Sequence, residues 1–400
     1  MRILYITELW NGFEDLICRG KSEAAGMPSF VYPLKAMIEE KGFSIDFAIV
    51  VKQPKTISIG AEWLKSSDYY WVCNWSFVKI ITLYKIIRKG NYDFVYGQGT
   101  AGGWGNFASL LAGKPFGMRL YGTFLAQHLD DNYFRFFRRR LLKSFVYNLP
   151  KQFMIMTNDG TKGDLVYNKL CLNKRLYKYY FWLNGVKKDQ DTITEETIDN
   201  YLSSIGVTQK DNLLLYPARY DPWKRQELAI EILHNLPDKI RGQFKLLLCG
   251  HNFDKEYYEQ LKKIVDSYGL INQVIFHDPI EPTILHTLMA SSFAVLSLYK
   301  FSNLGNVIIE ASLAGAFVFT VKDGSTDFLI DNGVTGISLP YDDNFVSSIA
   351  SQIVQYSENK ELTDSIKQNL KKRAELTFLS WEQRSENEIE LIDKSLKKRR

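Results

Sequence analysis

Short apolar runs alternate with segments of helical spacing along this chain of 400 residues. Near the start, the runs 1–7 and 45–51 have the length and composition of buried strands, and the segment 27–40 between them repeats apolar residues at helical intervals. Three more strands are predicted in the first half, at 93–97, 116–122 and 153–157. Alternation of strands and helices predicts a parallel sheet with helices on both faces.

This alternation stops once and then starts again. Residues 187–212 are polar and charged and contain no pattern of a buried strand. Five further strands are predicted after them, at 213–217, 244–249, 273–277, 294–299 and 316–320. The predicted fold class is therefore α/β with two Rossmann-like domains, the first at 1–187 and the second at 188–380. Residues 381–400 have the pattern of a final helix with a basic end.

The segment 298–320 combines an apolar helix with a single carboxylate. Its predicted helix, 306–314, is apolar almost all round, which is typical of a buried helix, yet it carries Glu310. A carboxylate is rarely buried without a partner, and free N–H groups at the helix start, near Gly305 and Asn306, attract anions. Glu310 is thus suited to accept hydrogen bonds from ribose hydroxyls. The alternative is a glutamate at the exposed edge of a mostly buried helix.

Two cations follow the predicted strand 213–217. Arg219 stands just past its carboxyl end, and Lys224 stands at the start of the next helix, after Pro222, a residue type suited to a first helical turn. Ligands of open α/β sheets bind outside the carboxyl ends of the strands. A planar fork and a point charge in that place suit a diphosphate. The alternative is a pair of solvated surface cations.

Several segments, in the right order, resemble glycosyltransferase family 4, a family of retaining enzymes with the GT-B fold. PAR-x4-K (217–224) resembles the diphosphate-binding Arg and Lys of that family, and SNLGNVIIEASLAG (302–315) resembles its E-x7-E motif. FWLNGVKK (181–188) looks like the family's segment at the domain junction. GSTDFLIDNGVTGISLP (324–340) looks like its glycine-containing stretch beyond the donor site. The resemblance runs along most of the chain.

The resemblance implies two domains that face a cleft, with the final helix packed back on the first domain. It also implies a nucleotide-sugar donor and no cofactor or metal requirement. Arg219 and Lys224 would bind the diphosphate and act in catalysis together with Glu310, which would bind the ribose. The residues implied in donor binding are Gly26, Ser302, Asn303, Leu304, Gly305, Asn306 and Val307. The sequence departs from the family at Ser302, which replaces the first Glu of E-x7-E, and at Tyr121, which replaces a His.

Candidate residues on the acceptor side of the cleft come from the first domain: Gly102, Gly103, Tyr121, Thr123 and His128. GQGTAG (97–102) also matches the dinucleotide fingerprint, which alone would indicate an NAD(P) oxidoreductase. It follows a late strand, however, and Thr123 and Phe124 stand where the fingerprint needs an acidic residue after the next strand. We therefore favour a Gly-rich helix start that lines the cleft.

Composition narrows the cellular setting. A net charge of +5 permits an anionic partner without naming one. The cysteines show no metal-type spacing and read as free thiols of a reducing compartment, and no apolar run reaches the ~18 residues of a membrane span. These features predict a cytoplasmic protein. Residues 130–150 mix aromatic and cationic side chains, which suits contact with an anionic membrane at its inner face. The alternative is an ordinary helix packed on the first domain.

The sequence thus predicts a retaining glycosyltransferase that moves a sugar from a nucleoside-diphosphate sugar to a glycan or lipid-linked acceptor, in bacterial surface polysaccharide assembly. Two other functions stay open. One is a nucleotide-sugar epimerase with the same fold, although the acid and base side chains that it needs are not seen. The other is a non-catalytic protein that binds sugar nucleotides, which the replacements at Ser302 and Tyr121 permit. Nucleic acid is not expected as a partner, because no reader motif is present.

Overall fold

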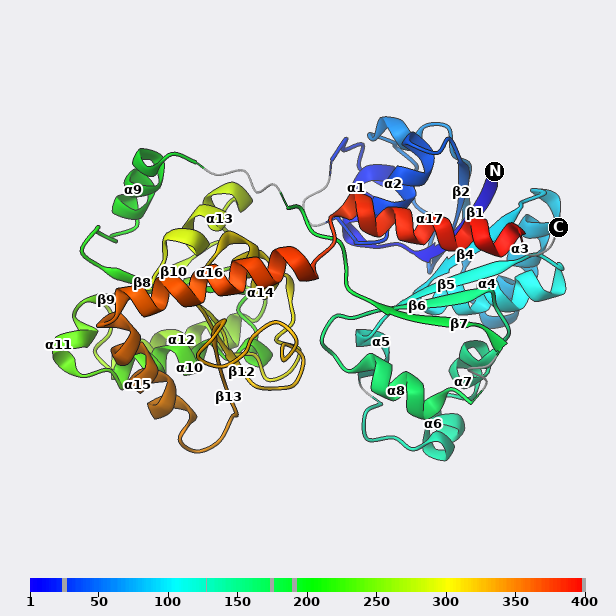
Figure 1. Cartoon of the computed structure of the whole chain (residues 1–400). Helices are drawn as coiled ribbons and strands as arrows, with labels where there is room; N and C mark the ends of the chain where they lie inside the picture. Colours follow the sequence, from blue (N-terminus) through cyan, green and yellow to red (C-terminus); the bar gives the residue numbers. More distant parts are fainter. Residues whose placement is uncertain (24–26, 127, 173–175, 189–192, 398–400) are drawn as a thin grey trace. The chain divides into compact units, whose positions relative to one another are not determined.

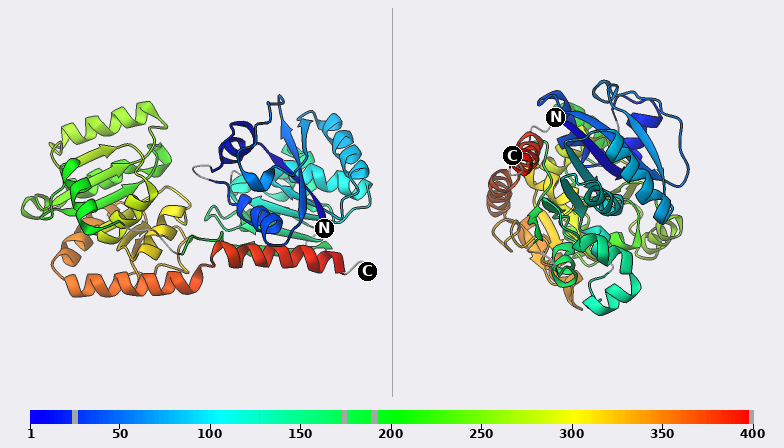
Figure 2. Two further views of the ribbon diagram at one scale, coloured as in Figure 1. Left: turned by 90° about the horizontal axis from the view of Figure 1, so that it is seen from above. Right: turned by 90° about the vertical axis from the view of Figure 1, so that its right-hand side faces the viewer.

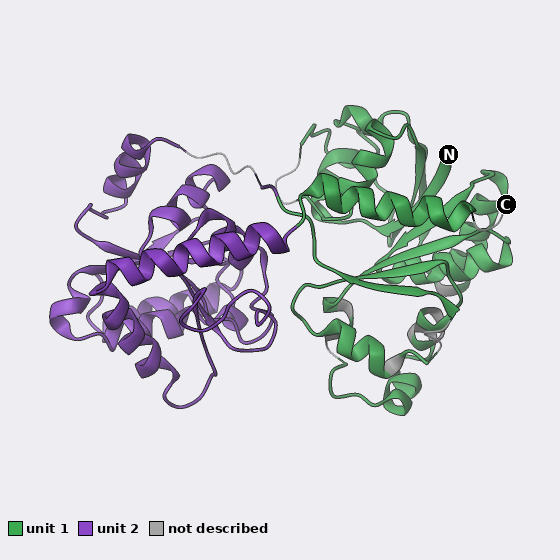
Figure 3. Cartoon of the chain, in the orientation of Figure 1, with its two compact units in different colours: residues 1–186, 379–400 green, residues 187–378 purple. Residues whose placement is uncertain are grey.

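The computed structural model describes residues 1–23, 27–126, 128–172, 176–188 and 193–397. The chain divides into two compact units (Figure 3). Unit 1 comprises residues 1–186 and 379–400, and unit 2 comprises residues 187–378. The domain boundaries expected from the sequence were 187/188 and 380/381. Each unit is described below by itself.

The described residues of unit 1 form a seven-stranded parallel sheet with the order β3-β2-β1-β4-β5-β6-β7 (Figure 1). The strands are β1 (Arg2–Glu8), β2 (Ser44–Val51), β3 (Tyr69–Cys73), β4 (Phe94–Gln98), β5 (Phe116–Tyr121), β6 (Phe153–Thr157) and β7 (Lys178–Trp182). This order is that of a doubly wound Rossmann sheet, in which the chain reverses direction across the sheet between its first and fourth strands.

Helices cover both faces of this sheet. They are α1 (Asn11–Cys18), α2 (Val31–Glu39), α3 (Ser76–Lys89), α4 (Gly99–Leu111), α5 (Thr123–Ala126), α6 (Tyr133–Arg139), α7 (Leu141–Asn148), α8 (Gly163–Leu170) and α17 (Trp381–Lys397), with a short 3-10 turn η1 (Glu62–Leu64). One apolar core joins the sheet to α3, α4, α7 and α8. A second core, on the other face, joins it to α1, α2 and α17. Both faces of the strands are therefore buried, as parallel sheets require.

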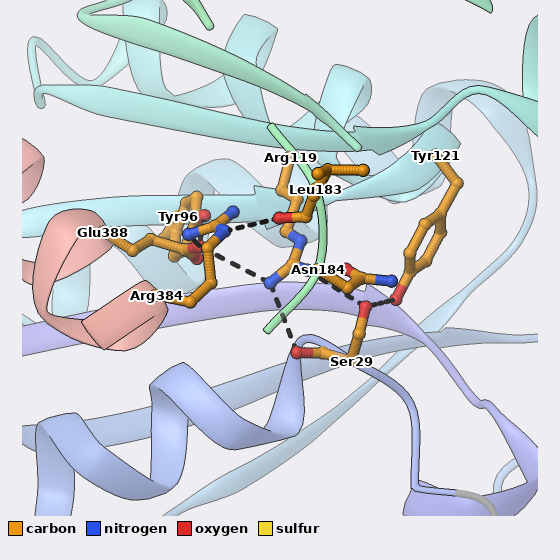
Figure 4. A network of polar contacts seen from close by, with 8 residues as sticks. All are labelled: Ser29, Tyr96, Arg119, Tyr121, Leu183, Asn184, Arg384 and Glu388. Atoms are coloured by element: carbon orange, nitrogen blue, oxygen red, sulfur yellow. Dashed lines mark hydrogen bonds and ion pairs between the residues drawn. The ribbon is translucent and has the colours of Figure 1, made fainter. Parts of the chain in front are cut away.

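The last helix, α17, lies along the sheet of unit 1 beside α2 (Figure 2). A buried ion network fastens it there. The Glu388 carboxylate of α17 accepts hydrogen bonds from Arg384 (2.9 Å) and Arg119 (3.4 Å) and from the Tyr96 hydroxyl (Figure 4). Arg119 and Glu388 are at most 1% exposed. Because an unpaired buried charge is very costly, each member of this network depends on the others.

The described residues of unit 2 form a second parallel sheet, of six strands, with the order β10-β9-β8-β11-β12-β13. The strands are β8 (Asn212–Pro217), β9 (Phe244–Cys249), β10 (Val274–His277), β11 (Ala294–Ser297), β12 (Val318–Val321) and β13 (Ile337–Leu339). The helical segments are α9 (Glu195–Ser204), η3 (Pro222–Lys224), α10 (Gln226–His234), α11 (Asp238–Arg241), α12 (Lys255–Ser267), α13 (Pro282–Ser291), α14 (Asn306–Ala314), α15 (Phe345–Ser357) and α16 (Lys360–Thr377). The predicted fold class, two parallel Rossmann-like sheets, is confirmed.

The structure adds strands and a break that the sequence pattern did not predict. Strands β3 and β7 lie at the two edges of the first sheet, and β13 lies at one edge of the second. Edge strands are covered less, so their apolar pattern is weaker, as in the half-exposed β7. The single helix expected within 130–150 was wrong: it is two helices, α6 and α7, separated at Arg140, whose φ of −136° is not helical.

Within the described part of the chain, no helix is both long and apolar enough to cross a membrane.

Candidate functional site

The candidate site of unit 2 lies where two neighbouring strands end and the direction of winding reverses. Strand β8 pairs with β9 on one side and with β11 on the other. The segment with Arg219 and Lys224 follows β8, and the segment with Ser302 and Gly305 follows β11. Ligands of doubly wound folds bind outside the carboxyl ends of the strands at this switch point. The two motifs singled out from the sequence therefore meet at the edge where a ligand is expected.

Backbone and ring contacts join these two segments. The Lys300 N–H donates to the Trp223 carbonyl oxygen (2.9 Å). The Trp223 and Tyr299 rings stack with centroids 6.4 Å apart, and the Phe301 ring meets Trp223 edge-on at 4.6 Å. The Lys224 ammonium is 3.5 Å from the centre of the Tyr299 ring. The loops after β8 and β11 thus form one surface with cations set among aromatic rings.

Lys224 is placed by the turn η3 that carries it. Asp221 caps this turn by accepting the Trp223 N–H (3.2 Å), and Pro222 occupies its first position. The Tyr216 hydroxyl, from β8, donates to the Lys224 carbonyl oxygen. The turn ends at Arg225, which has a left-handed backbone with φ of 54°. These contacts hold the backbone of the turn, and with it the position from which the Lys224 side chain starts.

The electrostatics of Lys224 are unusual for a lysine. Burial, together with repulsion from the nearby Arg219, lowers the pKa of Lys224 to about 7, against a weaker opposing effect of Asp221. The ammonium lies over two aromatic faces, those of Tyr299 and Trp223 (4.3 Å). Aromatic faces attract a cation but do not replace a carboxylate. The site therefore contains a positive charge that an anionic ligand would stabilise.

Arg219 lies near Lys224, and its guanidinium is accessible to a ligand from solvent. Its guanidinium pairs with Asp221 (2.9 Å) and lies over the exposed Phe253 ring at 4.4 Å. About half of the Arg219 side chain is exposed, 46%. Asp221 thus orients one side of the guanidinium fork and leaves the other donors to a ligand.

The loop after β11 uses its polar groups differently from the prediction. Asn303 and Leu304 were expected to bind the donor. The Asn303 N–H instead donates to Asp323 (3.0 Å), and the Leu304 N–H donates to the Ser325 hydroxyl (3.1 Å). Asn303 is fully buried. The backbone donors of these two residues are therefore occupied by the loop after β12.

Gly305, Asn306 and Val307 lie at the start of α14 and are partly or fully exposed. Gly305 is the N-cap of this helix and provides no side-chain cap. The first N–H groups of a helix have no acceptor within it, so the amides of Asn306 and Val307 point outward with the positive end of the helix dipole. These amides, beside Lys224 and Arg219, are suited to receive an anion.

Glu310 lies one turn further along α14. Its neighbours Ile309 and Ala311 are buried, but 37% of the Glu310 side chain is exposed, and its carboxylate is 3.8 Å from the His286 imidazole of α13. This exposure agrees with the alternative stated from the sequence, a glutamate at the exposed edge of a mostly buried helix. The sequence pattern could not decide between the two positions, since one residue on the open side of an apolar helix does not change the pattern.

Ser302 directly precedes Asn303, which is hydrogen-bonded to Asp323, and has a left-handed backbone, with φ of 61°. Its side chain is almost buried, at 8% exposed. For a residue other than glycine this conformation costs about 1–2 kcal/mol, so the surrounding structure must hold it in place.

Tyr121 ends β5 in unit 1 and belongs to a polar chain that starts at α17. Its hydroxyl shares a hydrogen bond of 2.6 Å with the Ser29 hydroxyl, which in turn accepts from Arg119 (3.0 Å) (Figure 4). Arg119 also donates to the Asn184 side chain (3.0 Å). The ring of Trp10 meets Tyr121 edge-on. Tyr121 is thus held at the carboxyl edge of its sheet.

Thr123 and His128, two other candidates, have internal roles. The Thr123 N–H donates to Asp159 (3.0 Å), which ties α5 to the loop after β6. His128 is buried, and its Nδ1 bonds to Asp131 (2.9 Å), next to Phe136. Asp131 also pairs with Arg135. These contacts stabilise the segment before α6.

Gly102 and Gly103 are buried within α4, behind the sheet edge. A Cβ at Gly102 would lie 2.5 Å from the backbone of Gly97 in β4. The glycine therefore permits helix and strand to pack closely, and this contact accounts for the fingerprint spacing without a ligand. Gly26 lies outside the described residues.

Sequence reasoning overlooked Trp223, Tyr299 and Asp323. Trp223 lies within the motif 217–224 and Tyr299 ends the predicted strand 294–299, but an aromatic residue at either position is equally typical of a core. Asp323 stands directly before the predicted stretch 324–340. Its contact with Asn303 spans twenty residues and exists only in the folded sheet.

Residues 198–373 match the family model of glycosyl transferases group 1. This stretch lies within unit 2. An uncharacterised glycosyltransferase of Methanocaldococcus jannaschii is 27% identical over 227 residues, which are 53% of this chain and 56% of the relative. An α-1,3/1,6-mannosyltransferase of Saccharomyces cerevisiae is 23% identical over 232 residues, 50% of this chain and 46% of the relative. The chain thus aligns with about half the length of these curated relatives.

The crystal structure of Anabaena Alr3699/HepE in complex with UDP is similar over 98% of this chain and all of that chain, with a TM-score of 0.70 and 18% identity. The fold is that of GT-B glycosyltransferases, as the sequence resemblance implied. Among the described residues, no group of three or more His, Cys, Asp or Glu side chains is arranged to hold a metal ion.

Proposed function

We propose that this protein is a glycosyltransferase that takes its sugar from a nucleoside-diphosphate sugar. One observation carries the proposal: Arg219, Lys224 and the amides at the start of α14 lie together at the switch point of a unit that matches the group 1 glycosyltransferase model. Three kinds of positive group at one sheet edge suit a diphosphate. The UDP in the structure of HepE supports a nucleotide ligand for this fold.

In the proposed reaction the diphosphate is the leaving group. Breaking the bond between sugar and phosphate leaves a growing negative charge on the phosphate oxygen, and Arg219 and Lys224 stabilise that charge. Glu310 accepts hydrogen bonds from the ribose. We propose that these two side-chain cations, rather than a cofactor or metal ion, neutralise the diphosphate. Transfer proceeds with retention, and the leaving phosphate takes the proton of the acceptor hydroxyl.

The acceptor is proposed to be a glycan or a lipid-linked saccharide of a bacterial surface polysaccharide, bound by unit 1 at a membrane. Helix α6 supports membrane contact. Its Phe134 and Phe137 side chains are 73% and 40% exposed, and Arg138 and Arg139 follow in its last turn. Leu141, at the start of α7, is exposed as well. Exposed aromatic and cationic side chains on adjoining helical turns favour the surface of an anionic membrane, which for a cytoplasmic protein is the inner leaflet.

The activity is tested by incubating the protein with a panel of UDP- and GDP-sugars, with and without lipid-linked acceptors. Release of the nucleoside diphosphate that depends on the acceptor supports transfer, whereas a changed sugar on an intact nucleotide would reveal an epimerase. Arg219→Ala and Lys224→Ala are each expected to lower the rate by about 100-fold, since one such group is worth ~3 kcal/mol. Lys367→Met, in α16, is the control and should be unaffected. Wild-type rates in both variants contradict the site.

Membrane contact is tested by sedimentation with vesicles containing anionic lipid. Binding should weaken as salt rises and should be lost in the double variant Arg138→Glu, Arg139→Glu. The control exchanges Lys239 and Arg241 of α11, in unit 2, for glutamate and keeps the same net charge. If both double variants bind equally, α6 does not carry the contact.

A further inference from the structure

We propose that Asp323 is a positioning residue of the donor site: through Asn303, it holds the loop that directs the first amides of α14 toward the diphosphate. The inference rests on the proposed function and deepens it. Asp323 lies just after β12, the strand that pairs with β11, and its carboxylate accepts the N–H of Asn303 in the loop after β11.

The carboxylate of Asp323 is saturated by the protein. Its Oδ2 accepts from the Asn303 N–H and from the Asn303 side-chain amide, both at 3.0 Å. Its Oδ1 accepts from the Ser325 N–H at 2.8 Å and from the Ser325 hydroxyl at 2.5 Å. A carboxylate has about four lone-pair positions. With four donors already bound, Asp323 acts on a ligand through the loop and not by direct contact.

Asn303 is saturated in the same way. Its side-chain oxygen accepts from the Tyr299 N–H (3.0 Å) and from the Ser297 hydroxyl (3.4 Å), and its side-chain amide donates to the Tyr299 carbonyl oxygen (3.1 Å) as well as to Asp323. Its carbonyl oxygen accepts the Gly305 N–H (2.8 Å). Asn303 therefore joins the end of β11, the loop after β12 and the N-cap of α14.

The hydrogen-bonded pair Asp323 and Asn303, called the joint below, has two consequences for the site. Tyr299, which Asn303 grips at both backbone groups, is the residue whose ring lies 3.5 Å from the Lys224 ammonium. The joint also holds the left-handed Ser302, since the next residue is anchored on every side. Loss of the hydrogen bonds between Asn303 and Asp323 would allow the Tyr299 ring to move away from the Lys224 ammonium. It would also allow the first amides of α14 to change direction.

The test compares Asp323→Asn with the wild type in two measurements. Asparagine keeps the shape but places an NH2 group where a carboxylate oxygen accepts two donors. Hydrogen exchange without ligand should become at least tenfold faster in the peptide covering 299–307, while exchange in α10 stays unchanged. Calorimetry should show the affinity for UDP, or for the diphosphate that the wild type binds best, falling by tenfold or more.

Two further variants separate positioning from a general loss of stability. Asp211→Asn is the matched control, because Asp211 also accepts an N–H and a hydroxyl, both from Thr208 at 2.8 Å, but at the start of β8, the opposite edge of the sheet. It should change neither measurement. Asn303→Ala combined with Asp323→Asn should lose no more affinity than the weaker single variant, since both break one joint.

The outcomes distinguish the two proposals. A wild-type protein that binds no nucleoside diphosphate overturns the proposed function. If the wild type binds but Asp323→Asn binds equally well, or exchanges equally slowly over 299–307, only the positioning role is overturned. Equal effects from Asp211→Asn also overturn it, because the loss would then reflect stability of the unit.

Discussion

Binding of a nucleoside diphosphate should be coupled to protonation of Lys224. In the free protein, burial and the neighbouring Arg219 lower the pKa of Lys224 to about 7. Two phosphate groups beside the amine would restore its pKa toward the ordinary value of about 10.4. Above pH 7 binding of the diphosphate is then accompanied by uptake of a proton by Lys224, so the affinity falls as the pH rises.

The size of the effect follows from the pKa of the free protein. At pH 7 about half of the free protein carries the proton, and at pH 8.5 only about 3% does. The affinity for the diphosphate should therefore fall about 15-fold between these values, or by ~1.6 kcal/mol. The phosphate itself titrates near pH 6 and changes little across this range.

Calorimetry in buffers with different ionisation enthalpies measures both quantities. About half a proton should be taken up for each diphosphate bound at pH 7, and nearly one at pH 8.5. Lys224→Arg should bind without proton uptake, because a guanidinium stays charged throughout.

Lys367 provides a matched control. Its pKa is also lowered by burial, but it donates to the Ser292 carbonyl oxygen, before β11, at the opposite edge of the sheet. Lys367→Met should keep the full pH dependence. A wild-type affinity that is constant from pH 7 to 8.5, without proton uptake, would refute the assignment of Lys224 to the diphosphate.

Three further results are expected. In calorimetry with the bare nucleoside diphosphate, Glu310→Gln should weaken binding by about tenfold, the lower range for a charged hydrogen bond, whereas Ser302→Ala should not; equal losses would show that the motif is misaligned. Burial lowers the pKa of Lys151 to about 7, so the folded protein binds fewer protons than the unfolded chain from about pH 7 to 10.5, and the unfolding free energy in urea should rise with pH there; the rise should shrink in Lys151→Met. Glu388→Gln should lower the unfolding free energy by about 3 kcal/mol, because the guanidinium groups of Arg384 and Arg119 stay buried without their carboxylate. Thermal denaturation measures this loss, and an unchanged midpoint would contradict the network.

The sequence by itself determined the architecture. Apolar runs of strand length, spaced by helical segments, are a local pattern. Strands of a parallel sheet are buried on both faces, so their sequences are apolar throughout and can be recognised locally. The interruption at 187–212 likewise separated the two sheets, because a polar segment cannot provide a buried strand. Edge strands such as β7 were not predicted, since they are covered on fewer sides and need fewer apolar residues.

The sequence also determined which residues could carry charge chemistry. Arg219 and Lys224 follow one strand and Gly305 follows another, and the carboxyl ends of parallel strands share an edge. Chain order does not specify that β8 and β11 are neighbours; their pairing in the folded sheet brings these residues to one place.

Only the tertiary structure decided what each of these residues has left to offer a ligand. Asn303 looked like a donor-binding residue, but Asp323, twenty residues away, occupies its N–H and its side chain. For Glu310 the sequence left a buried and an exposed position open, and the structure shows the exposed one, with 37% of the side chain reached by water. The reason is the same in both cases. Residue type and spacing specify which groups reach an edge of the sheet, whereas hydrogen-bonding capacity and hydration depend on neighbours that are brought together only when the strands pair.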